Sequence, residues 1–472
     1  MFGFKKKPQK RKIGRTGVVT EKRYYNSNSL IDKALFFIQN LTAKDIVTKD
    51  HQRILNSARY MYANNSYVKG YIGTMKRNVI GENGFALQMQ TANNDFNNKV
   101  EKAWNTWCKA VNCDIRKHSS FRDICNQVLS SLLIDGEAFI IINIKDKYPK
   151  LSVIDNALID SSYNNESKNI INGIEVDFLG SPRAYYIKDN GSHKRILAEN
   201  VIHIYEPVWA GQRRGISDLT STISKLQKLD QFENSALSNA KNSAKYLGFI
   251  EKSLDPSMME IEDDIVDDDG EAISQPKTRV EIEDSTIAYL ENSETFKSAS
   301  SQYPSGEFAS FNRALLHSIA AGLNISYQAL TRDINGTNYS GGRTATLEDQ
   351  KRYKTLQNFI VNSFVEVVFD KWASFFCLLN PSFTFSEVIG NAEWQCSRWS
   401  WVDPKKEADA NRILNELGVK TRKEIIKEMG KDPESTIAQI LKERELFADE
   451  IKTKKSKKSK KNKEVVSNEN DI

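Results

Sequence analysis

Carboxylates form the densest cluster of chemically capable side chains in this sequence. Eight acids occupy the twelve positions from 260 to 271, and no Lys or Arg follows them before Lys277. Two-metal nucleases hold such carboxylates around ions about 4 Å apart, but they do so on rigid strands. Here the acids repel one another between two prolines, which favours a charged surface or channel lining over a nuclease centre. The eight acids are Glu260, Glu262, Asp263, Asp264, Asp267, Asp268, Asp269 and Glu271.

A zinc cluster is conceivable from three of the cysteines and one histidine: Cys108, Cys113, His118 and Cys125. Their spacings of five, five and seven residues match no compact zinc-finger pattern. The chain has five cysteines and no C-x-x-C pair, so we interpret them as reduced, mostly buried thiols. The sequence therefore predicts no metal site and no cofactor.

Other catalytic patterns are missing from the sequence. It contains neither a G-x-x-x-x-G-K-[ST] phosphate loop nor an H-E-x-x-H metal motif. His203, in Val-Ile-His-Ile-Tyr, is typical of a hydrogen-bonded strand histidine rather than a ligand. Trp394, Trp399 and Trp401 could stack bases, but a core or a subunit interface is the commoner place for such residues. We predict that the protein is not an enzyme.

Charge divides the 472-residue chain into an acidic body and two basic ends. Residues 1–15 carry seven Lys or Arg and no acid, and residues 451–472 carry eight Lys and three acids. The remaining body has 52 bases and 58 acids, although the whole chain has a net charge of +6. A folded surface that grips DNA along its length would be basic, so only the ends favour phosphate contact. Solvated ends that aid solubility are the alternative.

Apolar runs are too short for a membrane span. No stretch of about 18 uncharged apolar residues occurs, and the N-terminal Met1–Arg15 lacks the apolar core of a signal peptide. The sequence therefore indicates neither membrane insertion nor secretion.

Helical and strand periodicities alternate over the first half of the chain. Helical spacing runs from Asp50 to Val79 and from Phe96 to Trp107, and Ser119-Ser120 can cap a helix over Phe121–Ile134. A β-rich run over Glu137–Ile144 follows, and then come short runs separated by turn signals. These short runs are Leu151–Ile154, Ile170–Val176, Arg183–Ile187 and Val201–Tyr205. The pattern predicts an α+β domain.

Two rods around a small β-rich insertion are predicted in the second half. One helix is expected over Ser217–Tyr246 and another over Phe308–Leu323, with short strands at Arg279–Glu283 and Thr286–Leu290 between them. Thr331–Gly342 is predicted as a polar loop before a long helix, Arg343–Leu379. Asp403-Pro404 is predicted to open a region of short helices, and the Lys-rich end is predicted to be unfolded.

A series of short motifs carries a family resemblance between about Asp50 and Glu445. The motifs, in chain order, are Ala63–Gly70, Asn78–Gly81, Val201–Tyr205, Gly211–Gly215, Ala320–Tyr327, Asn338–Ser340 with Arg343 and Leu347–Glu348, Trp401–Pro404 with Glu407–Ala408, and Gly430–Glu434. The sequence resembles the lambda family of tailed-phage portal proteins. The family tends to place small non-glycine residues where this chain has Gly341 and Gly342, and a glycine pair favours a loose, hinge-like backbone.

The resemblance implies an α+β portal fold with wing, stem, clip and crown, assembled as a ring of twelve copies at one capsid vertex. Laid on this sequence it implies a basic arm over 1–49, an α+β wing over 50–216, a stem helix over 217–248, a clip with the acidic insertion over 249–304, a second stem helix over 305–324, a channel loop over 325–342, a long wing helix with a Trp-rich segment over 343–402, a helical crown over 403–450 and a disordered tail over 451–472.

The resemblance also implies partners and sites. Double-stranded DNA would pass through the ring during packaging and ejection, bound without sequence readout. The ring would contact the large terminase subunit, which hydrolyses ATP, the major capsid or scaffold protein, and head-completion or tail proteins, and no membrane. It would be a virion component assembled in the bacterial host cytoplasm. A metal-dependent nuclease and another capsid or connector protein remain the alternatives.

Three sets of residues are the candidates for these contacts. The acids at 260–271 are the candidate terminase-docking surface. The candidate channel loop comprises Arg332, Asn338, Tyr339, Ser340, Gly341, Gly342 and Arg343, although Arg343 could instead brace its helix. The candidate DNA-contacting tail comprises Lys454, Lys455, Lys457, Lys458, Lys460 and Lys461.

Overall fold

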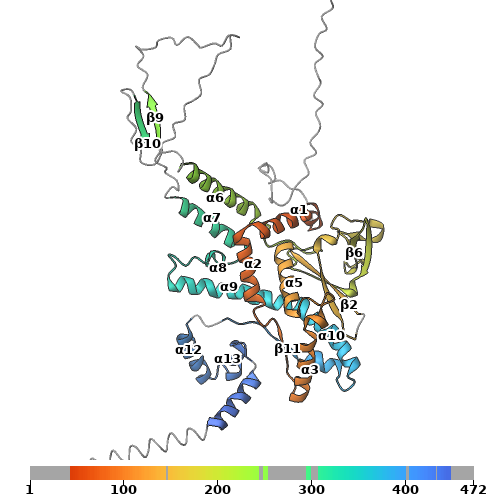
Figure 1. Ribbon diagram of the computed structural model, residues 1–472. Coiled ribbons are helices and arrows are strands. Elements are labelled where there is room, and N and C mark those ends of the chain that lie inside the picture. Colours follow the sequence, from red (N-terminus) through yellow and green to blue (C-terminus); the bar gives the residue numbers. More distant parts are fainter. Residues whose placement is uncertain are drawn as a thin grey trace, which may run out of the picture. The chain divides into compact units, whose positions relative to one another are not determined.

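The computed structural model describes residues 43–144, 147–243, 248–252, 294–298, 307–399, 403–431 and 433–447. Helices and antiparallel strands alternate along the chain, which confirms the predicted α+β class (Figure 1). The chain divides into two compact units, Lys225–Ser318 and the remainder, which are described separately. No helix in these ranges is both long and apolar enough to cross a membrane.

The larger unit begins with three helices that pack on one another. They are α1 (Ala43–Asn64), α2 (Ser66–Val79) and α5 (Phe121–Asp135). Asn65 separates α1 from α2, and its side-chain oxygen accepts a hydrogen bond from the Val68 amide. Ser120 and Asp123 form a reciprocal capping box at the start of α5, so the predicted cap is confirmed.

A three-stranded antiparallel sheet lies against α5. Its order is β3 (Lys150–Ile154), β2 (Glu137–Asn143) and β8 (Val201–Tyr205). Strand β2 is central and buried on both faces for most of its length, which explains its nearly continuous apolar run. Gly136 links α5 to β2 at φ 91°, and the Ile216 backbone passes so close that a Cβ there would lie 2.2 Å from it. Glycine is therefore required at this position.

A second, four-stranded antiparallel sheet follows. Its order is β4 (Ile170–Ile171), β5 (Ile174–Val176), β6 (Pro182–Asp189) and β7 (Ser192–Leu197). The single predicted strand over Ile170–Val176 is wrong, because Asn172 and Gly173 have positive φ and turn the chain into a hairpin. Strand β7 was not predicted, since five of its six residues are exposed and its pattern lacks an apolar face. Phe139 of β2 packs with Tyr185 of β6 in a shared core.

An aromatic core joins α3 (Asn94–Trp107) to one long helical segment. That segment consists of α9 (Tyr339–Ile360), a π-helical turn (Val361–Val365) and α10 (Glu366–Leu379). Trp104 packs against Phe369, Trp372 and Trp394, all with centroid distances below 6 Å. Trp394 lies on β11 (Ala392–Gln395), which pairs with β1 (Ala86–Met89). Trp394 is therefore partly buried against the aromatic core, and Trp399 contacts Tyr353. Trp401 lies outside the described residues.

The described residues of the smaller unit form two helices and a strand pair. The helices are α6 (Ile223–Ser243) and α7 (Phe308–Gly322), and each extends slightly beyond the unit. Phe232 of α6 stacks on Phe308 of α7. Strands β9 (Gly248–Lys252) and β10 (Glu294–Ser298) pair antiparallel. Helix α6 begins six residues later than predicted, because Ser217–Thr222 forms hydrogen-bonded turns in which the Leu219 amide donates to Ser217 Oγ. The strands predicted at 279–283 and 286–290 lie outside the described residues.

The remaining elements of the described residues are short or lie near the C-terminal end. They are α4 (Ala110–Cys113), α8 (Tyr327–Thr331), α11 (Phe385–Gly390), α12 (Pro404–Glu416), α13 (Arg422–Glu428), a helix over 433–447 and three 3₁₀ turns, Asn156–Leu158, Glu166–Lys168 and Ala198–Asn200. Asp403 caps α12 by accepting a hydrogen bond from the Lys406 amide, with proline at the first helical position, as the sequence predicts.

Candidate functional site

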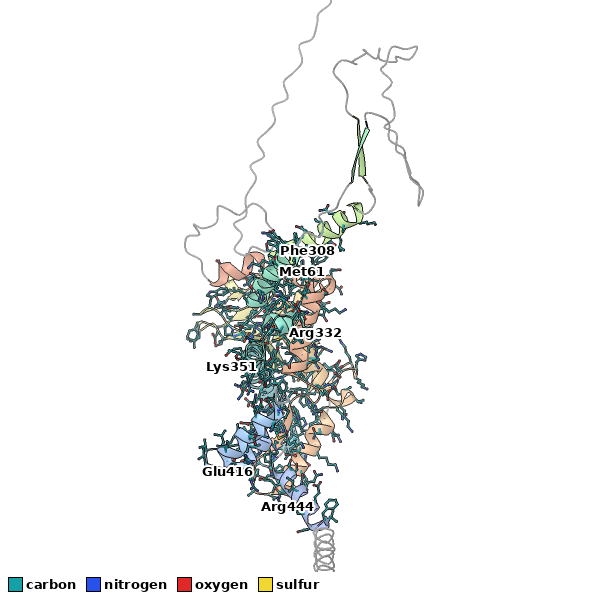
Figure 2. All side chains as sticks on the ribbon, turned by 90° about the vertical axis from the view of Figure 1, so that its left-hand side faces the viewer. Met61, Phe308, Arg332, Lys351, Glu416 and Arg444 are labelled. Atoms are coloured by element: carbon teal, nitrogen blue, oxygen red, sulfur yellow. The ribbon has the colours of Figure 1, made fainter. Side chains whose placement is uncertain are left out.

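The turn between α8 and α9 holds the residues of the candidate channel loop. Arg332 ends α8 in the left-handed conformation, with φ 60°. Its side chain is exposed and forms no ion pair with any residue in the described ranges. Figure 2 looks almost along the axis of α9 and shows Arg332 beside it. Arg332 is therefore a free cation at the surface of the turn.

Local hydrogen bonds hold this turn in one shape. The Asp333 carboxylate accepts from the Tyr327 hydroxyl at 3.0 Å and from the Asn335 amide at 2.9 Å. Gln328 Nε2 donates to Thr337 Oγ1 at 3.1 Å and so links α8 to the far side of the turn. At the tip, Ile334 is 76% exposed. The turn therefore presents an apolar tip and a free guanidinium on a rigid base.

The predicted loop over Thr331–Gly342 extends too far at its C-terminal end, because α9 already begins at Tyr339. Tyr339, Ser340, Gly341, Gly342 and Arg343 lie in the first turns of α9. Helix α9 begins here because Asn338 caps it: the Asn338 side-chain oxygen accepts a hydrogen bond from the Gly341 amide at 2.7 Å. A Cβ on Gly341 would lie 2.8 Å from that oxygen. The expectation of a loose, hinge-like glycine pair is therefore wrong, since both glycines are helical.

Two candidate loop residues contact α12 instead of standing free. The Tyr339 hydroxyl donates to Asp403 Oδ2 at 3.3 Å, and the Lys406 ammonium lies 5.4 Å from the Tyr339 ring centroid. Arg343 Nη2 lies 3.7 Å from a Glu407 carboxylate oxygen. Hydrogen bonds from Lys406 hold the pKa of Asp403 below its usual range, with a smaller contribution from Tyr339. Arg343 thus has the bracing contact that was its alternative role.

A buried ionic network that the sequence analysis missed connects β2 to the loop over residues 211–215. Glu137 and Arg214 are both almost fully buried, and Arg214 Nε and Nη2 donate to Glu137 Oε1 at 2.8 and 2.6 Å. The Gly215 amide donates to Glu137 Oε2 at 2.9 Å. Arg214 and Gly215 belong to the Gly211–Gly215 motif, so its function in the fold is to neutralise Glu137.

Two histidines complete this network. His203 Nε2 lies 3.1 Å from Glu137 Oε2, and His51 Nε2 lies 3.3 Å from Oε1. Burial alone would raise the pKa of Glu137, but Arg214 and the two histidines hold it well below its usual range. Burial lowers the pKa of His203 against the opposing effect of Glu137. His203 is the hydrogen-bonded strand histidine that the sequence predicted.

The three cysteines of the conceivable zinc cluster are thiols near one another. Cys113 Sγ donates to the Cys108 carbonyl oxygen at 3.4 Å and to the Ser119 carbonyl oxygen at 3.6 Å. Burial raises the pKa of Cys113 to about 12 and raises those of Cys108 and Cys125 further, so all three stay protonated. Within the described ranges, no three His, Cys, Asp or Glu side chains are placed to hold a metal ion.

Two of the three candidate sets, the acids of positions 260–271 and the lysines of positions 454–461, belong to segments outside the described residues. Of the three candidate sites, the structure therefore locates only the α8–α9 turn, and it brings Tyr339 and Arg343 together with α12 and leaves Arg332 apart.

Comparisons with known proteins agree on one family. Residues 33–357 match the family model described as phage portal protein, lambda family. A probable portal protein of Halomonas phage phiHAP-1 is 27% identical over 427 residues, which cover 84% of this chain and 81% of that protein. Portal protein B of Escherichia phage lambda is 23% identical over 390 residues, which cover 74% of this chain and 73% of that protein.

Solved structures give weaker similarities. A chain in the neck of an empty gene transfer agent particle has a TM-score of 0.47 and 13% identity, and the alignment covers 82% of this chain and 94% of that one. An HK97 family phage portal protein from Corynebacterium diphtheriae has a TM-score of 0.34 and 10% identity, with 75% of this chain and 97% of that one covered.

Proposed function

The chain belongs to the lambda family of phage portal proteins, and from this premise we propose that twelve copies close into a ring at one capsid vertex. Like its portal-protein relatives, the protein is a structural component of a phage particle and not an enzyme. The family match over residues 33–357 is the observation that carries the proposal. We further propose that the ring assembles in the host cytoplasm, against the capsid or scaffold protein, and later receives head-completion or tail proteins.

Electron microscopy of the purified full-length protein tests the ring directly. We expect annular particles with twelvefold symmetry and a central hole wide enough for a double helix. A monomer, or an open lattice without a hole, would contradict the proposal. Incubating the same sample with duplex DNA and Mg²⁺ tests the nuclease alternative, and we expect the DNA to stay intact.

The channel of this ring would conduct double-stranded DNA without holding it. Each phosphate neutralised by a Lys or Arg releases counterions and adds a salt-dependent grip. The body of the chain carries more acids than bases, so twelve copies would repel the phosphate backbone and keep the duplex free to slide. We therefore expect the ring to bind DNA without sequence readout.

The α8–α9 turn is our candidate for transient contact with the passing duplex. Its support is the free Arg332 guanidinium and the exposed Ile334 on a hydrogen-bonded base. The first turns of α9, from Asn338 to Arg343, would serve mainly to hold this turn, since Tyr339 and Arg343 contact α12.

Changing Arg332 to Ala tests this assignment. We expect rings of normal symmetry but less packaged DNA retained in full heads, measured as DNA protected from nuclease. Arg422→Ala, which also removes an exposed arginine, is the matched control and should retain DNA normally. Equal retention by Arg332→Ala and wild type would exclude a role for Arg332.

The acids at 260–271 are our proposed docking surface for the large terminase subunit, which would supply ATP hydrolysis. The support is their density, since eight like charges create a strong local field for a basic partner. Reversing four of them (Asp263, Asp264, Asp267 and Asp268) to Lys should weaken terminase binding in a pull-down. Reversing four exposed acids elsewhere (Glu166, Asp189, Glu199 and Glu416) is the control. Undiminished binding by the first variant would refute the docking role.

A further inference from the structure

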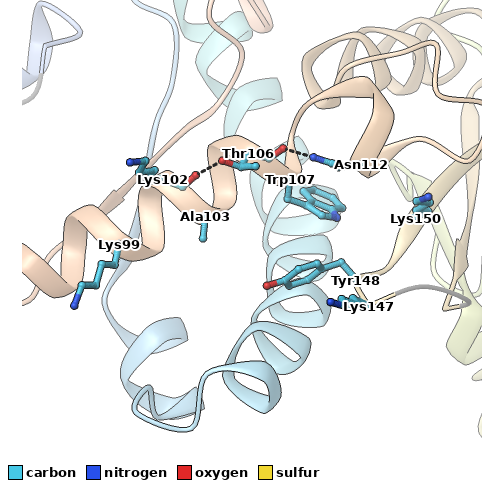
Figure 3. A pocket seen from close by; sticks show the side chains of 9 residues that line it. All are labelled: Lys99, Lys102, Ala103, Thr106, Trp107, Asn112, Lys147, Tyr148 and Lys150. Atoms are coloured by element: carbon cyan, nitrogen blue, oxygen red, sulfur yellow. Dashed lines mark hydrogen bonds between the residues drawn. The ribbon is translucent and has the colours of Figure 1, made fainter.

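A hollow in the larger unit is lined by lysines and by two aromatic side chains. It has a volume of about 870 Å³. Lys99 and Lys102 come from α3, and Lys147 and Lys150 come from the β2–β3 connection and the start of β3. Trp107 and Tyr148 lie between these two groups of lysines (Figure 3). This volume falls in the range of hollows that bind ligands.

The positive charge of this hollow is not neutralised by its own lining. No Asp or Glu belongs to the lining, and Lys99, Lys102 and Lys147 form no ion pair within the described ranges. Two smaller hollows differ in this respect, because Glu424 lines both of them and Lys427 beside it pairs with Glu393. The lysine hollow therefore concentrates positive potential on a concave wall.

The aromatic side chains of the hollow are already engaged on one side. The Trp107 indole N–H donates to the Pro149 carbonyl oxygen at 2.9 Å, its ring stacks on Trp104 at 4.8 Å, and only 3% of the residue is exposed. Tyr148 stacks on Trp372. A nucleobase needs an open ring face for stacking, so these rings offer an apolar floor and not a base-stacking platform.

Hydrogen bonds fix the α3 side of the hollow. Thr106 Oγ1 donates to the Lys102 carbonyl oxygen, and Asn112 Nδ2 donates to the Thr106 carbonyl oxygen, both at 2.8 Å (Figure 3). These bonds tie the last turn of α3 to α4. The lysine stems of α3 therefore start from a rigid backbone, and the binding surface needs no rearrangement to form.

We infer that this hollow docks an acidic peptide segment of a partner protein, with carboxylates on the lysines and one apolar side chain on the Trp107–Tyr148 floor. Charge complementarity selects an anion, and a hollow of about 870 Å³ has room for a few side chains but not for a double helix. The apolar floor favours a peptide over a free phosphate, which would leave it empty. The inference does not require the ring.

Fluorescence anisotropy of the full-length protein with a labelled peptide, Glu-Glu-Asp-Leu-Glu-Asp-Glu, tests this inference. Changing Lys99, Lys102 and Lys147 together to Gln should weaken binding at low salt by about tenfold, since three exposed ion pairs are removed. The control variant changes Lys69, Lys168 and Lys194 to Gln, three exposed lysines outside the hollow, and should bind like wild type. Circular dichroism confirms that both variants are folded.

A second measurement needs no variant. Carbodiimide cross-linking joins a bound carboxylate to the nearest lysine amine, and mass spectrometry should locate the peptide on Lys99, Lys102 or Lys147. Equal affinity in the two variants, cross-links spread over other lysines, or equal binding of a Gln/Asn version of the peptide would each overturn the inference. Hollow-dependent binding of a single-stranded oligonucleotide, but not of the peptide, would overturn it in favour of nucleic acid. None of these outcomes alters the result of the electron microscopy.

Discussion

Glu137 shows how one buried carboxylate organises the larger unit. It accepts hydrogen bonds from Arg214 and Gly215 of one loop. It also contacts His203 of β8 and His51 of α1. Removing one member of a buried ion pair leaves the other charge without compensation, which costs more than the pair itself contributes. The Gly211–Gly215 motif is therefore explained by charge neutralisation inside the fold.

We predict that Arg214→Met lowers the free energy of unfolding by about 3–5 kcal/mol, because Glu137 would remain buried and unpaired. Arg195→Met is the matched control: Arg195 also pairs with a carboxylate through two hydrogen bonds, to Glu175, but it is 44% exposed. Its loss should cost far less, because water screens an exposed ion pair. Urea unfolding of the two variants measures the difference, and similar losses would contradict the role of burial.

The same network predicts an acid-sensitive fold. The pKa of His203 is lowered in the folded protein from its ordinary 6.5, and that of Glu137 is held well below its ordinary 4.5. The unfolded chain therefore binds more protons than the folded one, and stability falls as the pH drops, first below about 6.5 through His203 and then below about 4.5 through Glu137.

Thermal unfolding between pH 7 and pH 4 checks this dependence. His203→Gln should unfold at a lower temperature at pH 7 but should lose less of its remaining stability between about pH 6.5 and pH 5, because the titrating imidazole is gone. His193→Gln is the control, since His193 is partly exposed beside Asp160. A wild-type protein whose melting temperature is flat over this range would contradict the role of His203.

At the scale of elements, the start of α9 decides how the α8–α9 turn is held. Asn338 caps the helix, and Tyr339 and Arg343 connect its first turns to α12. Only seven residues, 332–338, lie between α8 and α9. The candidate contact with DNA is therefore a short turn on two helices and not a long mobile loop.

Replacing Gly341 and Gly342 one at a time by Ala tests this geometry. Replacing glycine by alanine within a helix increases the stability of the helix by up to about 1 kcal/mol. At Gly342 the nearest atom to a new Cβ is Thr337 Cγ2 at 3.4 Å, so we expect Gly342→Ala to be stabilising. At Gly341 the new Cβ would lie 2.8 Å from Asn338 Oδ1, and losing that cap costs about 1 kcal/mol. Gly341→Ala should therefore gain nothing, and equal melting temperatures for the two variants would contradict the cap.

At the scale of the whole molecule, charge is distributed by segment. The body carries an excess of acids, and the two ends carry an excess of lysine and arginine. In the proposed ring, the acidic body binds the phosphate backbone only weakly, so the DNA can slide through the channel. The basic ends provide the phosphate contacts. DNA affinity of the ring should then depend on its ends more than on its folded surface.

We predict that changing the six tail lysines from Lys454 to Lys461 to Gln weakens binding of duplex DNA at low salt. It should also flatten the dependence of log affinity on log salt by about 0.9 for each phosphate that the tail no longer neutralises. A filter-binding series over salt concentration measures both. Deleting residues 464–472 is the control, since it shortens the tail without removing a lysine. An unchanged slope in the Lys→Gln variant would mean that the tail does not bind DNA.

Features that depend on neighbouring residues or on composition could be predicted before the fold was known. The serine cap before Phe121, the helix that opens at Asp403 and Pro404, and the strand over Val201–Tyr205 are local patterns, and the structure confirms them. The family resemblance is confirmed as well, because ordered motifs survive at low identity. Segmental charge also follows directly from counting residues.

Tertiary structure alone decided which distant residues meet. Glu137 and Arg214 are 77 positions apart, and nothing in their local sequence marks them as a pair. The sequence predicts Tyr339 and Arg343 in a loop, but the Asn338 cap starts α9 before them. Both residues also contact α12, more than 60 positions away. The lysine hollow likewise joins α3 to a strand connection about 40 residues later. Such contacts depend on how the chain packs in three dimensions, whereas periodicity and composition describe only the order of residues along the chain.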